Sequence, residues 1–360
     1  GRKGLLVLDE TTSFLPDDGV NRVLDTVRKV RSEGNAVLFV SHRLEEVFAL
    51  CDSVTVLRDG RVVMSQALAE TSREDLVRAM TGGRVGMPVA RERDPASVVP
   101  QLALAGASAR PAPASSGPAG AEEALAVTDL EWRPVGPVSF GLRRGEVVGL
   151  SGLLGSGFEL LPYGLFGAAP ARGRVDVGDR SIQVSRLSPT SAMRLGFGLV
   201  PADRMGHGGI GSATVADNIT MLALNRKGRF SFVSSRVQNK GTAQAIRRFD
   251  IRPDRPDREF RHLSGGNQQK AIIAKWSEFA ASVLLIHEPT RGVDIAAKQQ
   301  ILAAIQELAA SGRAVLIASA DCGDLAAVCD RVLIISQGRI KRTLTGGELT
   351  EQRIQTAIHG

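Results

Sequence analysis

Short apolar runs separated by helical patterns recur along the chain. Two of them, at residues 5–8 and 36–40, flank an amphipathic segment, and the same arrangement returns at 283–286 and 314–318. Short runs of this kind, rich in β-branched residues, are typical of strands buried in a parallel sheet. The pattern predicts an α/β fold with a parallel-sheet core.

An internal repeat underlies this recurrence. Residues 5–62 align without a gap on residues 283–340, and Glu10 falls opposite Glu288. Each copy is expected to form a buried strand, an acidic turn, an amphipathic helix and a second buried strand. A long α/β region, 125–282, precedes the second copy, whereas almost nothing precedes the first. If the copies are homologous throughout, the first is the C-terminal remnant of a domain.

Between the copies the composition changes. Residues 85–123 are dominated by Pro, Ala, Ser and Gly and show no apolar periodicity, which is typical of a flexible linker. We therefore expect a partial first unit at 1–84, this linker, and a nearly complete second unit at 124–360.

Composition narrows the function classes. The net charge is +7, but the basic residues are scattered and aromatic residues make up only 4%, so we do not expect a nucleic-acid partner. The apolar runs are shorter than the ~18 residues that span a bilayer. Three cysteines without metal-ligand spacing suit a reducing compartment.

The strongest chemical signal is the segment LSGGNQQK, residues 263–270. Ser264, Gly265 and Gly266 stand where the next helix is expected to begin, and they would present a hydroxyl and free backbone N–H groups to an anion. The alternative is an ordinary helix N-cap, a common role for serine. The following Asn, Gln and Lys residues, with an acidic strand end farther along, favour the anion site.

Two carboxylates follow the first apolar run. Asp9 and Glu10 stand at the expected carboxyl end of a strand, where open α/β sheets place their ligand sites. Asp9 could hold Mg²⁺ through water, and Glu10 could polarise an attacking water. His42 follows the second strand, where it could contact a γ-phosphate; the alternative for a lone histidine is a surface or core position.

A glycine-rich segment follows another apolar strand at 146–150. Gly152, Gly155 and Gly157 have the spacing of a phosphate-cradling loop, GxxxxGK[ST]. Phe158 replaces the lysine that would pair with phosphates, and Glu159 replaces the Mg²⁺-binding Ser or Thr. The loop is therefore expected to keep its fold role and to lose its catalytic one.

Together these motifs resemble the ATP-binding cassette (ABC) family, specifically the duplicated ATPases of monosaccharide importers. The resemblance covers nearly the whole chain except the linker. It implies P-loop NTPase-type nucleotide-binding domains, one partial and one nearly complete, with a parallel-sheet core and a helical subdomain. It also implies ATP and Mg²⁺ as cofactors and hydrolysis of ATP as the reaction.

The resemblance assigns roles residue by residue. Glu10 and His42 would be the catalytic glutamate and the switch histidine, and Asp9 would serve the metal. Residues implied to contact or surround the nucleotide are Ser264, Gly265, Gly266, Gln268, Gly152, Gly155, Gly157, Trp132, Glu288 and Asp294. The second copy departs from the family pattern, since His287 stands at the metal-binding Asp position and Ala320 at the switch-histidine position.

In this family each ATP is clamped between the P-loop of one cassette and the signature of the other. Asp9, Glu10 and His42 would thus face Ser264–Gln268. This chain alone is expected to hydrolyse ATP poorly or not at all, because no intact P-loop remains: the loop of the first cassette is missing, and the second has Phe158 and Glu159. The resemblance further implies membrane permease subunits, through them a periplasmic or lipid-anchored sugar-binding protein, and a peripheral location on the cytoplasmic face of the inner membrane.

Two alternatives remain at this point. One is a soluble double-cassette protein that acts on ribosomes or nucleic acid, although such proteins usually have a long charged helical linker and two near-consensus sites. The other is a non-catalytic remnant that at most binds nucleotide.

Overall fold

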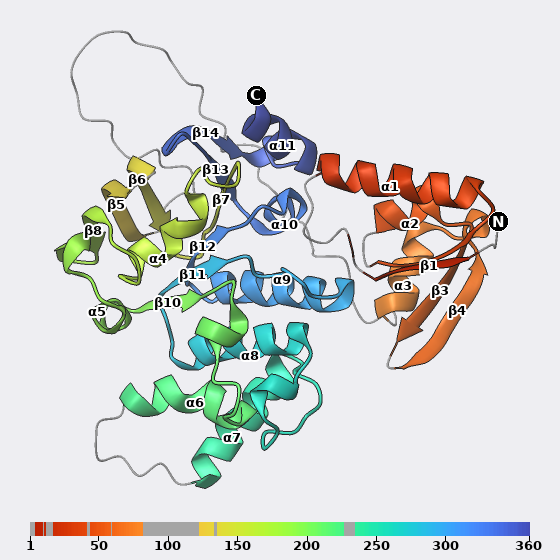
Figure 1. The fold of residues 1–360 in the computed structure, drawn as a ribbon. Coiled ribbons are helices and arrows are strands. Elements are labelled where there is room, and N and C mark those ends of the chain that lie inside the picture. Colours follow the sequence, from red (N-terminus) through yellow and green to blue (C-terminus); the bar gives the residue numbers. More distant parts are fainter. Residues whose placement is uncertain are drawn as a thin grey trace. The chain divides into compact units, whose positions relative to one another are not determined.

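The computed structural model describes residues 4–9, 11, 17–41, 44–58, 60–81, 122–132, 135–226 and 235–360. They form two compact units (Figure 1). Unit 1 comprises Gly1–Met87 with Gly292–Gln299, and unit 2 comprises Pro88–Arg291 with Gln300–Gly360. Most of the predicted linker, residues 85–121, lies outside the described residues.

A six-stranded sheet forms the centre of unit 2. Its order is β10 (Phe197–Val200), β11 (Val283–His287), β12 (Ala314–Ala318), β7 (Val147–Gly152), β13 (Arg331–Ser336) and β14 (Arg339–Thr345). The first five are parallel and β14 is antiparallel to β13. Almost every residue of β7, β11 and β12 is buried, because a parallel sheet is covered on both faces. The predicted parallel-sheet core is confirmed.

Helices connect these strands in chain order. The helix α9 (Ile295–Ala310) follows β11, α10 (Cys322–Val328) follows β12, and the short turn η7 (Gly346–Glu348) and α11 (Glu351–His359) follow β14. After β7 the chain forms one turn of 3-10 helix, η3 (Phe158–Leu160), before α4 (Leu161–Leu165).

A second sheet in unit 2 is antiparallel, and the sequence patterns did not predict it. Its order is β6 (Val135–Arg143), β5 (Glu123–Trp132), β8 (Arg172–Val177) and β9 (Arg180–Gln183). After β9, the 3-10 turn η4 (Val184–Arg186) and the helix α5 (Pro189–Arg194) lead to β10. Arg331 of β13 donates to the Gly141 carbonyl of β6 at 2.5 Å, and this hydrogen bond joins the two sheets. Arg331 also forms a buried ion pair with Glu146, just before β7, at 2.7 Å.

The helical part of unit 2 holds α6 (Val215–Arg226), α7 (Ser235–Arg248) and α8 (Gly265–Glu278) (Figure 1). A π-helical turn, η5 (Arg204–Gly208), and a 3-10 turn, η6 (Phe260–His262), complete it. Trp276 of α8 packs edge-on against Phe166 and Phe279, with ring centroids 5.9 and 5.6 Å apart. The predicted helical subdomain is present.

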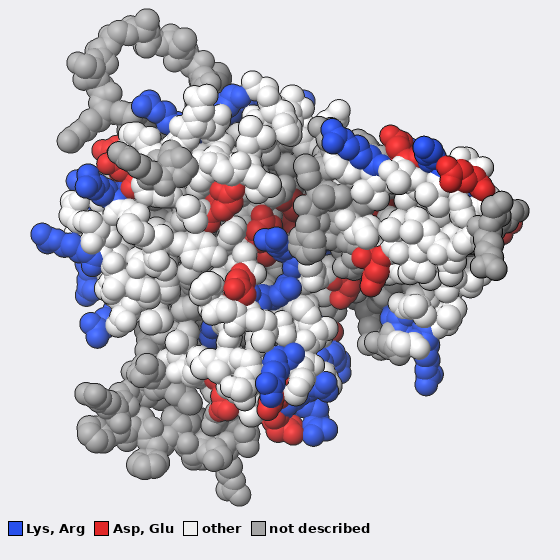
Figure 2. Space-filling view, in the orientation of Figure 1, with Lys and Arg blue, Asp and Glu red and all other residues white. Residues whose placement is uncertain are grey.

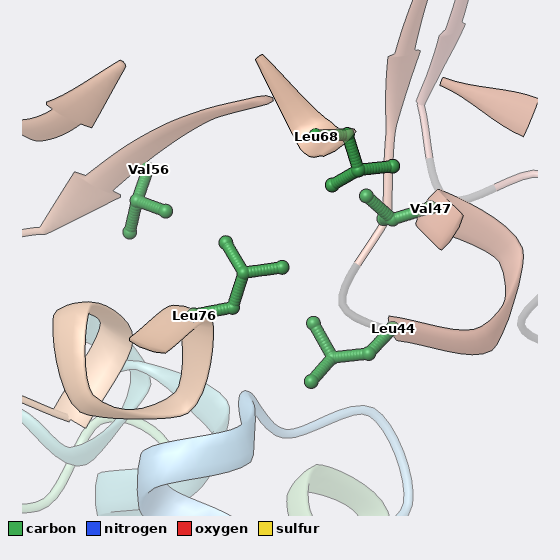
Figure 3. Packing of buried hydrophobic residues seen from close by; sticks show 5 residues of the cluster. All are labelled: Leu44, Val47, Val56, Leu68 and Leu76. Atoms are coloured by element: carbon green, nitrogen blue, oxygen red, sulfur yellow. The ribbon is translucent and has the colours of Figure 1, made fainter. Parts of the chain in front are cut away.

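Unit 1 has two small sheets. The strands β1 (Leu5–Asp9) and β2 (Ala36–Val40) are parallel, and β3 (Ser53–Arg58) and β4 (Arg61–Ala67) form an antiparallel hairpin. Its helices are α1 (Asp17–Ser32), α2 (Leu44–Leu50), η1 (Leu68–Glu70) and α3 (Arg73–Thr81). Figure 3 shows the core cluster between the hairpin, α2 and α3, made of Leu44, Val47, Val56, Leu68 and Leu76.

The two copies of the repeat have matching elements. Each element from β1 to α3 has a counterpart from β11 to α11 with the same length and position in the alignment. Even the irregularity of the hairpin is repeated, since the register shifts at Val56/Leu57 in unit 1 and at Ile334/Ile335 in unit 2.

The prediction that β1 and β2 are buried strands is wrong. Their residues alternate between exposed and half-buried, and Leu5, Val7, Leu38 and Val40 are 64%, 54%, 53% and 44% exposed. In unit 2 the counterparts β11 and β12 are flanked by β10 and β7. In unit 1, β1 and β2 pair only with each other among the described residues. One face of this pair packs against the buried residues of α1, and the other face is exposed in the described part of unit 1.

Charge is distributed over both units. On the face drawn in Figure 2, basic side chains gather near the β8 edge, and elsewhere acidic and basic side chains are interspersed. Among the described residues, every helix is too short or too polar to cross a membrane.

Candidate functional site

The glycine-rich loop joins β7 to η3 at the carboxyl end of the central sheet. Gly155 and Gly157 have φ of +84° and +95°, a conformation that favours glycine. A Cβ on Gly152 would lie 2.3 Å from the carbonyl oxygen of Ile335, so only glycine fits there. All three predicted loop glycines therefore lie at the strand end where α/β sheets bind ligands.

Glu159 and Phe158 take the places of polar phosphate ligands in this loop. Phe158 is 0% exposed and belongs to the core. Glu159 is half-buried, and its carboxylate accepts a hydrogen bond from the backbone N–H of Gly155 at 3.0 Å. A side chain of the loop thus uses one of the N–H groups that a phosphate-binding loop offers to its ligand.

His287 ends β11 and bonds to Tyr163 of α4. The Tyr163 hydroxyl lies 3.0 Å from His287 Nδ1, the two rings meet edge-on at 5.5 Å, and the Ala202 N–H donates to the same hydroxyl. Burial lowers the pKa of His287 to about 4, against an opposing effect of the Glu159 charge. Burial also raises the pKa of Tyr163. At neutral pH both groups are therefore uncharged.

Glu288 follows His287 in a left-handed conformation, with φ +49°. Its carboxylate accepts hydrogen bonds from the Ala320 N–H at 2.7 Å and from Ser319 Oγ at 3.1 Å. Burial raises its pKa despite these two donors. The carboxylate is thus directed toward the end of β12 and held there.

Ser264 occupies the N-cap position of α8, so the helix begins where the segment LSGGNQQK predicts, but the side chain does not cap it. Its hydroxyl accepts from Asn267 Nδ2 at 2.8 Å and makes no hydrogen bond to a backbone N–H of the first turn. Asn267 in turn accepts from the Arg252 N–H at 2.7 Å. Ser264 is exposed and Gly265 is half-buried, so the first residues of this helix are accessible to solvent.

Gly266 and Gln268 lie deeper in the same turn. Gly266 is buried, and Gln268 is 8% exposed with its amide directed to the Phe260 carbonyl at 3.4 Å. The next turn is anchored by Lys270, which donates to the Asp250 carbonyl and to Gln300 Oε1. The motif therefore has an exposed part and a part that fixes the helix in place.

Trp132 and Asp294 have local structural roles in this structure. The Trp132 ring lies against Gly164 of α4, and it also lines a groove of about 950 Å³ whose other walls include residues 167–172. Asp294 is exposed and accepts from the Ala297 N–H at 2.9 Å at the start of α9.

In unit 1, Asp9 is the last residue of β1 and is exposed. Glu10 and His42 lie outside the described residues. An exposed carboxylate is a ligand that Mg²⁺ prefers, so Asp9 suits the metal. Its counterpart His287 does not, because a half-buried imidazole hydrogen-bonded to Tyr163 offers no oxygen ligand. The part of the chain that the structure describes holds no cluster of three His, Cys, Asp or Glu side chains able to bind a metal.

Two residues that the sequence did not single out complete the arrangement. Tyr163 gives no local signal, because its partner lies 124 residues away along the chain. Arg204 of η5 donates to the Arg291 carbonyl at 2.7 Å, and thereby links η5 to the segment after β11. Only the folded chain brings these groups together.

Comparisons with known proteins agree with this fold. Residues 135–291 match the ABC transporter family. A dimeric ATP-binding cassette solved in a post-hydrolysis state with ADP and Pi aligns over 61% of this chain and 98% of its own length, with a TM-score of 0.54. Because the sequence identity is 17%, this is a likeness of fold alone.

Two relatives are similar over nearly the whole chain. A putative ribose/galactose/methyl galactoside import ATP-binding protein of Agrobacterium fabrum is 36% identical over 99% of the chain, and a ribose import ATP-binding protein of Chelativorans sp. is 37% identical over 98%. The chain spans 66% and 65% of their lengths. With the glycine-rich loop, the parallel sheet and the helical subdomain in place, the chain belongs to the ABC transporter family of ATP-binding cassettes.

Proposed function

We propose that this chain is part of the ATP-hydrolysing subunit of an ABC importer for a small sugar. The observation that carries the proposal is the identity of 36–37% over nearly the whole chain to relatives named for ribose or galactose import. These names do not favour the alternative of a soluble cassette protein acting on ribosomes or nucleic acid. A permease in the membrane, and through it a sugar-binding protein, would be its partners on the cytoplasmic face.

We assign the proposed roles residue by residue, to a first cassette that we delimit as residues 1–84 and a second as residues 124–360, with a linker at 85–123 between them in the sequence. Asp9, Glu10 and His42 would come from unit 1, and Ser264–Gln268 from unit 2. Asp9 and Ser264 are both exposed, and the Ser264 hydroxyl, which accepts from Asn267, keeps its own proton to donate to an anion, which supports this assignment. The corresponding groups of unit 2, His287 and Glu288, are occupied by neighbours.

In this site Glu10 would orient and deprotonate the water that attacks the γ-phosphate, and His42 would contact that phosphate. The hydroxyl of Ser264 and the N–H groups of Gly265 and Gly266 would stabilise the negative charge of a γ-phosphate. Mg²⁺ bound near Asp9 would neutralise part of the negative charge of the phosphates.

The test is ATP turnover by the complete protein with its permease. Glu10→Gln should lower turnover by at least about a hundredfold, while ATP binding persists, because the variant loses general-base chemistry alone. Glu33→Gln, an exposed glutamate after α1, is the matched control and should keep full turnover. Undiminished turnover by Glu10→Gln would refute the assignment of the base.

Sugar uptake into vesicles tests the transport role separately. ATP-dependent uptake of ribose or galactose that disappears in Glu10→Gln supports the proposal. ATP turnover that is indifferent to the permease and to any sugar would overturn it.

A further inference from the structure

The glycine-rich loop of unit 2 already holds an anion, and that anion is part of the chain. Gly155 and Gly157 have positive φ angles, which shape the turn of the loop, and the N–H groups of such turns are the donors that phosphate-binding loops offer to an anion. Glu159 follows within one turn, and its carboxylate accepts from the Gly155 N–H at 3.0 Å. The carboxylate therefore accepts from an N–H group of the loop that a nucleotide phosphate would otherwise use.

The loop 152–159 contains no basic side chain that could neutralise the negative charge of the Glu159 carboxylate. Phe158, at the lysine position, is fully buried in the core. At the neighbouring strand end His287 is neutral at physiological pH, and its Nδ1 is engaged by the Tyr163 hydroxyl. A triphosphate that entered here would meet the negative charge of Glu159 without a lysine or a metal-binding oxygen at the usual positions.

The other polar group of this strand end is also satisfied from within the chain. Glu288 accepts from Ser319 and from the Ala320 N–H. Three groups that a nucleotide site normally turns toward ligand are thus bound by their own neighbours: the loop N–H, the strand-end residue and the following glutamate. Because internal partners already satisfy them, entry of a ligand would have to break these bonds first.

We propose that Glu159 is a built-in occupant of the glycine-rich loop, a specificity-determining residue that excludes nucleotide phosphate from the second site. This inference goes beyond the proposed function. It holds whichever solute is carried, because it concerns residues 152–159 alone. It leaves the site at Ser264–Gln268 as the part of unit 2 that is available to ATP.

A purely structural role for Glu159 makes a different prediction. If the carboxylate only closes the turn, its charge is irrelevant, and Glu159→Gln keeps an acceptor for the Gly155 N–H without admitting nucleotide. If the charge excludes phosphate, Glu159→Gln and Glu159→Thr both admit it. Threonine in addition restores a residue type that supports Mg²⁺ in loops of this kind.

The experiment compares the 360-residue chain with Glu159→Gln, Glu159→Thr and a control, Glu351→Gln, an exposed glutamate in the first turn of α11. A fluorescent ATP analogue is titrated with Mg²⁺, and hydrogen-exchange mass spectrometry with Mg²⁺ and ATP localises the binding. Unchanged tryptophan emission verifies that each variant is folded, since Trp132 and Trp276 both lie in unit 2.

We expect peptides covering 152–159 to gain protection with ATP in both Glu159 variants, with an affinity at least about tenfold above that of the parent and of Glu351→Gln. Equal protection of this segment in the parent chain, or no gain in either folded variant, would overturn the proposal. Protection at 264–268 reports the other proposed site, so failure of one proposal is not mistaken for failure of the other.

Discussion

The strands β1 and β2 of unit 1 and β11 and β12 of unit 2 are counterparts in the repeat, yet their surroundings differ completely. Val7 is 54% exposed and its counterpart Leu285 is 0% exposed. Both sequences are apolar, so the difference comes from the elements that flank them: β10 and β7 in unit 2, and only each other in the described part of unit 1. An apolar run specifies a strand, and its neighbours decide whether that strand is buried.

Side chains at the turns of the repeat also make buried contacts in unit 2 and exposed ones in unit 1. Asp330 accepts from the Val147 N–H of β7 at 2.8 Å, whereas its counterpart Asp52 pairs with Arg31 on the surface. Arg331 forms a buried pair with Glu146, whereas its counterpart is Ser53. The same repeat position thus stabilises a sheet in unit 2 and faces water in unit 1. Substitutions at paired positions test this contrast directly.

The largest difference is expected at Arg331. Replacing Arg331 by Met leaves the Glu146 carboxylate buried without its partner, which should lower the free energy of unfolding of unit 2 by about 3–5 kcal/mol. Tryptophan emission in a guanidinium titration measures this loss, because both tryptophans lie in unit 2. Ser53→Ala, read by hydrogen exchange of unit 1, should change stability by less than about 0.5 kcal/mol. Equal effects would erase the contrast.

The second comparison pairs substitutions at counterpart positions of the strands β11 and β1. Leu285→Ala creates a cavity in a fully buried sheet and should cost about 3 kcal/mol, by the same titration. Val7→Ala removes a side chain that is mostly in water and should cost less than about 0.5 kcal/mol. A cost above about 2 kcal/mol for Val7→Ala would mean that this face of β1 is covered in solution.

The third prediction concerns pH and the pair of His287 with its counterpart Asp9. The pKa of His287 is about 4 in the folded chain and near 6.5 when unfolded, so the unfolded state binds more protons between these values. The stability of unit 2 should therefore fall by about 2 kcal/mol as the pH drops from about 6.5 to 4. The charged groups that act on the imidazole are Glu159 and Arg291.

Guanidinium midpoints taken at several pH values check this. In His287→Gln the slope across the window should flatten, because the titrating group is gone, while Asp9→Asn in unit 1 should leave the slope of unit 2 unchanged. A slope that persists in His287→Gln would assign the acid sensitivity to other groups.

The smallest effect is expected at the aspartates. Asp330→Ala removes the acceptor of the Val147 N–H and should lower the stability of unit 2 by about 1–2 kcal/mol. Asp52→Ala breaks an exposed pair with Arg31 and should cost less than about 1 kcal/mol. Comparable losses at both positions would show that β7 contributes little through this contact.

Local patterns predicted much of the fold. The apolar run at 283–286 and the spacing of Gly152, Gly155 and Gly157 depend on residues close in sequence, so strand and loop could be placed before the structure. The start of α8 at Gly265 follows from the capping residue and glycines before it. These features are set by local backbone preferences.

Contacts between distant residues could not be predicted in the same way. The bond between Tyr163 and His287 spans 124 residues, and that between Val147 and Asp330 spans 183. The exposure of β1 was mispredicted for a related reason, since burial depends on the elements packed around a strand and not on the apolar run itself. The contact between Glu159 and Gly155 is local. The sequence alone does not tell whether the Glu159 carboxylate points into the loop or into solvent.

The chain contains a single tyrosine, and that residue lies beside the glycine-rich loop with its hydroxyl on His287. Isotope labelling of tyrosine would consequently give one ring signal in a magnetic resonance spectrum, free of overlap from any other residue of its type. The signal would shift when the imidazole gains a proton or when the hydroxyl loses its partner. The molecule thus carries its own spectroscopic marker at the second site.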